Sequence, residues 1–189
     1  MAQDVDLAQF ARRLLRFDAG ALIRLRGDRA WGLLPWSVLV SVSLPTPVQG
    51  DRVFAAKDGT PRDAQWVVAL PPAAASTVEV VPLSSVLGAA QAAAKTLREL
   101  AGRAGERAIR DALLDHEVIT GVSDVDGTSF TVTQRLVQAM VRMGFAQADP
   151  IEIRVTGPWT ALASPLGQAW HRQQSQLTVR PIVNHLHGR

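Results

Sequence analysis

The sequence predicts an α+β protein with antiparallel sheets and a central helical segment. Three observations predict this class: alternating strand patterns near both ends of the chain, turn signals between them, and helical spacing of apolar residues in the middle. With 189 residues, of which 47% are hydrophobic and 20% charged, the chain can bury a sizeable core. We expect residues 1–75 and 76–189 to form two parts that pack as one compact unit.

The first part is expected to be a helix followed by antiparallel strands. Apolar residues at helical spacing follow two aspartates that can cap a helix, and they predict a helix over residues 5–17. Residues 21–26 alternate as a half-buried strand that ends at a Gly27-Asp28 turn. Further strands are expected from Ala30 onward, over 36–44, 52–56, 66–70 and 77–81, with a linker candidate at 71–76.

The second part is expected to be helical first and then to form another helix with a hairpin. Ser84 or Ser85 can cap a helix that reaches Leu100, and the helical period resumes over 106–116. This pattern leaves open two helices in a hairpin or one kinked helix. Turn and capping signals then predict a hairpin about Asp126-Gly127, a Thr131/Gln134 capping box, a helix over 133–143, and strands over 151–155, 159–163 and 177–180.

A weak internal repeat links the two ends of the chain. Phe17 and Trp31 are matched at a constant offset by Phe145 and Trp159, each pair following a helical pattern and an Ile-x-Leu/Ile-Arg strand pattern. The pattern predicts two helix-plus-hairpin units that share a core. Coincidence between common residues is the alternative.

Composition excludes several classes of protein. The chain has no cysteine, which excludes disulfides, a thiol nucleophile and a Cys-ligated zinc. Its pI of about 10.5 reflects the absence of Tyr and Cys more than a strong basic charge, because the net charge is only +3. The N-terminal residues lack signal-peptide features, and apolar runs are shorter than the roughly 20 residues of a membrane span. We therefore expect a cytoplasmic location and no membrane partner.

The densest polar cluster lies on the second central helix. Its residues are Arg110, Asp111, Asp115 and His116, and the two carboxylates stand one helical turn apart. Such groups can act as acid, base or metal ligand. The alternative is a solvated helix face with ordinary i,i+4 ion pairs.

No motif predicts a cofactor, a metal or a catalytic residue. The segment from Asp124 to Gly127 lacks the later ligands of a calcium loop, and His185 and His187 have no carboxylate nearby in the sequence. Gly102–Gly105 lacks the Lys and Ser/Thr of a phosphate-binding loop, and no serine lies in a nucleophile elbow.

Arginines gather near the N-terminus. Arg12, Arg13 and Arg16 cluster on the first predicted helix, and Arg24 and Arg26 project from one face of the following strand. A single basic face of this kind could contact the phosphates of a nucleic acid. The alternative is that these side chains pair with acids or cover the edge of an apolar sheet.

The C-terminal region offers a candidate ligand or partner groove at Trp159, Pro165, Trp170 and His171. An exposed tryptophan beside a histidine and a proline is typical of a binding surface. The alternative is that the tryptophans anchor the core, with each indole N–H bonded to a loop carbonyl.

Several sequence blocks resemble an uncharacterised family of proteins from high-GC bacteria. The resemblance rests on Val81-Pro-Leu83, on residues 105–116 and 134–145, and on Gly157-Pro-Trp159 with Pro165 and Trp170. The region from Leu25 through Trp31 to Ser41 resembles its N-terminal part, so nearly the whole chain is covered. The resemblance implies a two-part organisation and no activity, cofactor or mechanism.

These observations favour a non-catalytic binding or structural module that acts through protein contacts. A second copy of the chain is the expected partner, which makes a homodimer. The first alternative is a nucleic-acid-associated regulator that uses the arginine-rich face. An enzyme with a site at the polar helix cluster is the third interpretation.

Overall fold

The computed structural model describes residues 6–100 and 106–173. The expected strand over residues 177–180 and the residues His185 and His187 lie outside these ranges. In chain order the elements are α1 (Leu7–Leu15), β1 (Leu22–Leu34), β2 (Val38–Ala55), the short 3-10 helix η1 (Asp63–Gln65), β3 (Ser76–Val81), α2 (Leu83–Leu100), α3 (Glu106–Leu114), β4 (Glu117–Val122), β5 (Ser129–Thr133), α4 (Gln134–Arg142), β6 (Ile151–Thr156), β7 (Trp159–Ser164) and β8 (Gly167–Arg172).

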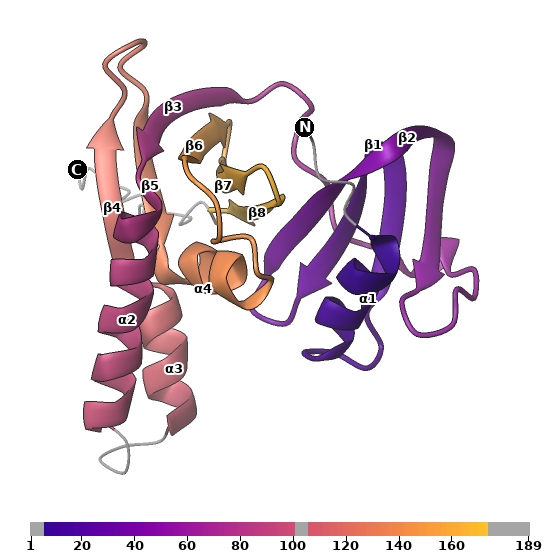
Figure 1. The fold of residues 1–189 in the computed structure, drawn as a ribbon, viewed down its shortest axis with the longest axis horizontal. Coiled ribbons are helices and arrows are strands. Elements are labelled where there is room, and N and C mark those ends of the chain that lie inside the picture. Colours follow the sequence, from indigo (N-terminus) through magenta and orange to yellow (C-terminus); the bar gives the residue numbers. More distant parts are fainter. Residues whose placement is uncertain (1–5, 101–105, 174–189) are drawn as a thin grey trace, which may run out of the picture.

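The strands form one large antiparallel sheet and a separate hairpin (Figure 1). The six-stranded sheet has the order β1-β2-β8-β7-β6-β3, and β4 pairs with β5 alone. Every pairing is antiparallel, and α2 and α3 stand between β3 and β4 in the chain. The predicted α+β class, with antiparallel sheets and a central helical segment, is confirmed. Because β2 pairs with β8, residues 1–75 and 76–189 contribute strands to the same sheet.

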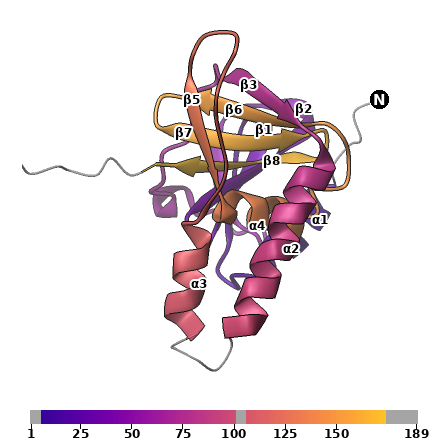
Figure 2. The ribbon, with the colours of Figure 1, turned by 90° about the vertical axis from the view of Figure 1, so that its left-hand side faces the viewer.

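Helices α1 and α4 cover one face of the large sheet (Figure 2). Phe10 and Leu14 of α1 and Met140 of α4 are almost completely buried against strand residues such as Ile23 and Val40. Burial of such side chains contributes about 1.5–3 kcal/mol each to folding. This shared apolar layer fixes the two helices on the same side of the sheet.

A smaller tryptophan-rich cluster lies on the opposite face, where Trp31, Trp159 and Trp170 pack around Leu39. The segment before β3 covers this cluster with Trp66, Val68 and Leu70. The prediction of a strand over residues 66–70 is wrong, because these residues form no strand. The segment looks like a strand in the sequence because it is extended and every second side chain, those of Trp66, Val68 and Leu70, packs on the sheet. Val67, between the first two, is 88% exposed.

The predicted turn at Gly27-Asp28 is also wrong. Strand β1 continues through these residues, and its pairing with β2 shifts register there. Gly27 has φ +59°, a left-handed conformation that favours glycine and is typical of a bulge. The chain instead reverses at the end of β1, where Ser37 has φ +62°.

The two strands expected over residues 36–44 and 52–56 are one strand, β2. Pro45 and Pro47 do not interrupt it, because β8 pairs with β2 only over Leu39–Ser41. Pro45 and Pro47 lie beyond that short contact, on an edge of β2 that pairs again, among the described residues, only near Phe54, and an edge tolerates residues that lack an N–H donor.

Most helix predictions agree with the structure. The Asp6 side chain accepts a hydrogen bond from the Ala8 N–H at 2.9 Å and caps α1. The central helical pattern forms two helices, α2 and α3, that contact each other. The predicted Thr131 capping box is wrong: Thr131 lies in β5, and the N-cap of α4 is Thr133, whose side chain makes no capping hydrogen bond.

The internal repeat is not confirmed. A helix followed by a strand occurs at both places, α1 with β1 and α4 with β6. Trp31, however, lies within the continuous strand β1, whereas Trp159 begins β7 after a turn. In the first copy the hairpin is formed by β1 and β2 and turns after Leu34, so Trp31 and Trp159 do not occupy equivalent places.

Candidate functional site

A groove of about 730 Å³ lies where the α2–α3 pair meets α4 and the turn after β1. One wall is apolar, one rim is charged, and Trp36 stands beside them. We call it the Trp36 groove, and its lining residues are Pro35, Trp36, Ala93, Ala94, Leu97, Asp111, Leu113, Leu114, Asp115, Gln134, Arg135, Gln138 and Arg142.

Contacts with α4 and with Phe17, just after α1, hold Trp36 in place. Its indole N–H donates to the carbonyl of Arg135 at 3.2 Å. Its ring meets Phe17 edge to face, with centroids 5.4 Å apart and planes at 84°. The Arg142 guanidinium lies 5.9 Å from the centre of the Trp36 ring. An aromatic side chain held on several sides presents a rigid surface to the groove.

Arg135 joins three elements across the groove. Its Nη1 donates to the Trp36 carbonyl at 2.6 Å, and its Nη2 is hydrogen-bonded to Asp115 just after α3. The Arg135 side chain is only 14% exposed, whereas Asp115 is 69% exposed. The pair therefore fixes the end of α3 relative to α4 and leaves the carboxylate at the rim.

Gln134 has an unusual environment. The residue is 1% exposed, yet neither Nε2 nor Oε1 of its side chain makes a hydrogen bond within the part of the chain that the structure describes. The adjacent Thr133 Oγ1 and Arg135 Nε are buried and unpaired as well. Buried polar atoms are nearly always hydrogen-bonded in folded proteins, so a cluster of unpaired ones at the start of α4 requires an explanation.

The charges that line the groove balance. Two arginines, Arg135 and Arg142, face two aspartates, Asp111 and Asp115. Electrostatics therefore attracts neither an anion nor a cation strongly to this place. The groove can offer apolar contact and a neutral hydrogen-bonding group.

The predicted polar helix cluster lies partly in this groove. Asp111 and Asp115 line it, while His116 is exposed and is not among the lining residues. Arg110 belongs to α3, but its side chain is outside the described set. Sequence reasoning missed Trp36, Gln134 and Arg135. Gln134 carried a signal, because it lies three residues before Val137 on the apolar stripe of its helix.

The predicted C-terminal groove is divided between two environments. Trp159 and His171 line a second hollow of about 700 Å³ together with Leu33, Leu39 and Val68. Pro165 is exposed in the β7–β8 turn, and Trp170 is 4% exposed in the tryptophan-rich cluster. Neither of these two residues lines the second hollow.

His171 is held against the turn after β1. Its Nδ1 lies 3.1 Å from the carbonyl of Ser37. Burial lowers the pKa of His171, and the nearby Arg135 charge lowers it further, against opposing effects of the Ser37 carbonyl and Asp115. Burial therefore favours the neutral form of the ring.

The five predicted polyanion-binding arginines do not form one surface. Arg12 and Arg13 lie on α1 and Arg16 is its C-cap residue, and α1 packs on the sheet face that buries Ile23. Arg24, the next residue in β1, points to the opposite face, with its guanidinium 5.8 Å from the Trp66 ring. Arg26, two residues on, shares the Arg24 face, because side chains alternate along a strand.

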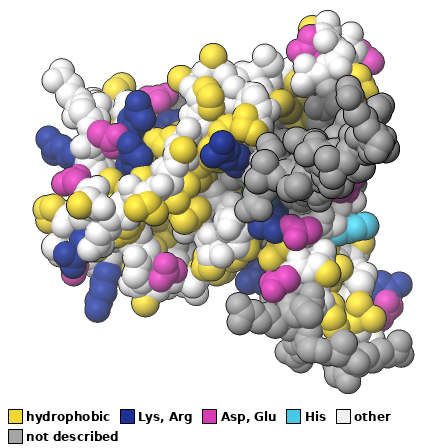
Figure 3. Space-filling model, turned by 180° about the vertical axis from the view of Figure 1, so that it is seen from behind, with side chains coloured by type: hydrophobic (Ala, Val, Ile, Leu, Met, Phe, Trp, Pro, Cys, Tyr) yellow, Lys and Arg dark blue, Asp and Glu magenta, His cyan; other side chains and the backbone are white. Residues whose placement is uncertain are grey.

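Several of these arginines already have partners. Arg13 donates to the carbonyl of Met143 at the end of α4, and Arg12 lies 3.6 Å from an Asp6 oxygen. Arg24 Nε donates to Asp51 at 2.7 Å, and this hydrogen bond lowers the pKa of Asp51. On the face seen in Figure 3, Lys and Arg side chains stand apart, several of them beside acidic ones.

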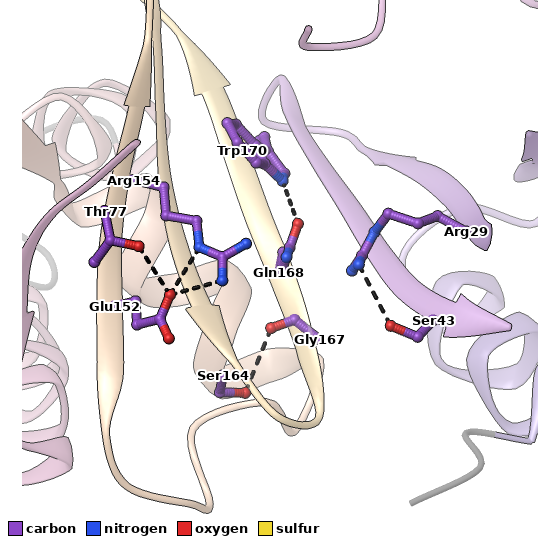
Figure 4. A network of polar contacts seen from close by, with 9 residues as sticks. All are labelled: Arg29, Ser43, Thr77, Glu152, Arg154, Ser164, Gly167, Gln168 and Trp170. Atoms are coloured by element: carbon purple, nitrogen blue, oxygen red, sulfur yellow. Dashed lines mark hydrogen bonds and ion pairs between the residues drawn. The ribbon is translucent and has the colours of Figure 1, made fainter. Parts of the chain in front are cut away.

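Other polar contacts stabilise the sheet (Figure 4). Glu152 Oε2 accepts from Arg154 Nε at 2.8 Å and from Thr77 Oγ1 at 3.1 Å, which joins β6 to the edge strand β3. The hydrogen bond from Arg154 lowers the pKa of Glu152. Within β8, Trp170 Nε1 donates to Gln168 at 2.9 Å. Each of these groups has a structural partner.

The remaining predicted motif, Asp124 to Gly127, forms the turn of the β4–β5 hairpin. Asp126 accepts a hydrogen bond from the Thr128 N–H at 3.0 Å, and Gly127 has φ +71°. The predicted hairpin is confirmed. Among the residues described, no group of three or more His, Cys, Asp or Glu side chains is placed to hold a metal ion. No described helix has the length and apolar character needed to span a membrane.

The fold and the groove define the class of protein. It is an antiparallel α+β domain in which three parts enclose a groove: the α2–α3 pair, α4, and the turn after β1. The chain belongs to the family described as "Domain of unknown function (DUF8185)", which matches residues 70–176. The resemblance to an uncharacterised family is thus confirmed, and the high-GC bacterial origin stays a prediction. The matched range contains every groove-lining residue except Pro35 and Trp36.

Solved structures with a similar fold include one that aligns over most of this chain. It is the crystal structure of the beta subunit from DNA polymerase of Streptococcus pyogenes, with a TM-score of 0.51 at 8% sequence identity. The similarity covers 87% of this chain, and the chain spans about 61% of that protein's length. At this identity the likeness concerns the fold alone. No curated protein matches the sequence.

Proposed function

We propose that the chain is a non-catalytic binding module of the cytoplasm that holds a segment of a partner protein in the Trp36 groove. The observation that carries this proposal is the composition of the groove. It joins an apolar wall and a fixed tryptophan to a charge-balanced rim. Such a mixture of an apolar centre and a polar rim is typical of protein interfaces.

The apolar wall comes from α2 and α3. Ala93, Leu97 and Leu113 are half-buried, and Ala94 is exposed. Val86 is the one residue of α2 that is fully buried among those described. A helical pair with so little buried surface leaves apolar area for a partner to cover.

The polar groups of the groove support binding more than catalysis. Arg135 is occupied by Asp115 and by the Trp36 carbonyl. Among the described residues that line the groove, Asp111 and Asp115 are the only ones of a type that transfers protons, and Asp115 is hydrogen-bonded to Arg135. No described lining residue is a His, Ser, Thr or Lys. The nucleic-acid alternative has less support, because its arginines lie on two faces of the sheet and several are paired.

A peptide-binding experiment tests the proposal. A displayed library of random peptides is selected against the wild-type protein, and the affinities of selected peptides are measured by fluorescence anisotropy. The variant Ala94→Trp fills the groove and should weaken binding by about tenfold or more. The matched control is Ala92→Trp, an exposed position of α2 that does not line the groove and should bind as wild type does. Failure to select any peptide, or equal loss in both variants, would refute the proposal.

The homodimer is part of the same proposal, because a second copy of the chain can supply the partner surface. Light scattering at micromolar concentrations should then give twice the monomer mass of 20.4 kDa. A mass of one chain across the whole concentration range would remove the dimer and leave a different protein as partner.

A further inference from the structure

We infer that Gln134 recognises the backbone of an extended peptide, with its side-chain amide accepting from one backbone N–H and donating to one backbone C=O of the bound segment. The inference rests on the proposed function and names the chemistry of the partner. Gln134 would meet the neutral backbone groups of the bound segment, and the side chains of that segment would meet other parts of the groove.

The first argument is the unmet hydrogen-bonding capacity of Gln134. Gln134 is among the residues that line the groove, but the residue is 1% exposed, and the donor and the acceptor of its side chain are both buried and unpaired within the described chain. The amide therefore has to turn outward to meet a bound segment. A buried amide without a partner destabilises the folded state. Another buried glutamine, Gln168, illustrates the usual solution, since it accepts from Trp170 at 2.9 Å. The missing partner of Gln134 is therefore expected from outside.

The second argument is complementarity. A side-chain amide offers one acceptor group and one donor group side by side, and a residue in an extended chain offers its own N–H and C=O on the same side, which is the matching pair. A carboxylate or phosphate would satisfy only the donor, and an ammonium only the acceptor. The balanced charges of Arg135, Arg142, Asp111 and Asp115 add no preference for either ion. A neutral group that both donates and accepts fits best.

The third argument concerns the conformation of the partner. The backbone groups of a helix are bonded within the helix, so they are not free to pair with Gln134. An extended segment exposes an N–H and a C=O at each residue and turns alternate side chains to opposite sides. Its apolar side chains can then contact Trp36 and Leu97, which line the same groove. The inferred occupant is an extended segment with apolar side chains next to the recognised peptide group.

A direct test follows the Gln134 amide by NMR. The side-chain NH₂ resonances of Gln134 are assigned as those that disappear in Gln134→Met, and the protein is titrated with N-acetyl-leucine methylamide or with sodium acetate. Saturable shifts of these resonances with the amide and not with acetate are expected. Shifts with acetate alone would make the site an anion site, and no shift with either probe would overturn the inference.

A second test separates this inference from the proposed function. Peptides selected against the wild type are N-methylated at one backbone position at a time and bound to wild type, to Gln134→Met and to the control Gln91→Met, an exposed position of α2 that does not line the groove. Methylation at one position should lower the affinity for wild type and for Gln91→Met by about tenfold, and should not lower the affinity for Gln134→Met any further. If Ala94→Trp abolishes binding while Gln134→Met binds as wild type does, the proposed function stands and the backbone recognition is wrong.

Discussion

Replacing Gln134 with methionine should stabilise the protein. Methionine has the same unbranched shape and a similar volume, but it carries no amide. An unsatisfied buried polar group costs about 1–3 kcal/mol, so its removal should raise the free energy of unfolding by about that amount. For a chain of this size, each kcal/mol corresponds to roughly 2–4 °C in Tm. The increase arises because both Gln134 side-chain polar atoms are buried without partners.

A second buried glutamine supplies the control. Gln168 is 9% exposed, and its Oε1 accepts from the Trp170 indole N–H. Gln168→Met leaves that donor without its partner and should lower the free energy of unfolding by about 1–3 kcal/mol. The same chemical change is thus expected to have opposite signs at the two positions.

Urea unfolding followed by tryptophan fluorescence measures both changes, since the tryptophans of the buried cluster lose their environment on unfolding. A Gln134→Met protein that is less stable than wild type by about 1 kcal/mol or more would refute the reasoning. It would mean that the amide is hydrogen-bonded in solution, and the argument for an external partner would lose its basis.

Three further predictions concern other parts of the molecule. We expect no salt-sensitive retention of the wild type on a phosphocellulose column; retention that Arg13→Glu with Arg24→Glu abolishes would restore the nucleic-acid interpretation. The free energy of unfolding should fall as pH drops from about 7 to 5, because burial lowers the pKa of His171 in the folded protein and the unfolded chain therefore binds a proton on this side chain first. His171→Gln should flatten this part of the curve of urea midpoint against pH. An unchanged curve would contradict the role given to His171. Gly32→Ala should lower stability by about 1–3 kcal/mol, because a Cβ there would lie 2.5 Å from a Leu14 methyl carbon; an unchanged Tm would mean that α1 does not pack this closely on β1.

The stability and binding predictions are linked through Gln134. A residue that destabilises the free protein and binds a partner is a common form of compromise between stability and function. If Gln134→Met both stabilises the free chain and weakens peptide binding, one substitution will have separated these two roles.

Local patterns predicted the elements whose causes are local. The helix around Phe10 and Leu14 begins at the Asp6 cap, and the β4–β5 hairpin turns at Asp126-Gly127 as expected. Each of these features depends on residues within a few positions of one another. The turn at Gly27 failed because a glycine with positive φ serves a bulge as well as a turn, and only pairing with β2 decides between them.

The candidate site was predicted only in part for the same reason. Asp111 and Asp115 were found because a helical spacing relates them, but the groove they border depends on Trp36 and Arg135, which are 99 positions apart. No spacing rule connects such residues. Their contact exists because α4 packs beside the turn that follows β1.

The sequence by itself determined the α+β class, the positions of most helices and strands, and the charge and apolar content of each segment. These properties follow from local periodicity, capping and turn chemistry. Only the tertiary structure decided that Arg13 and Arg24 lie on opposite faces of one sheet, that Trp159 and Trp170 belong to different surroundings, and that Gln134 is buried without a partner. Burial and pairing depend on which distant segments share the core, and packing over the whole chain sets that arrangement.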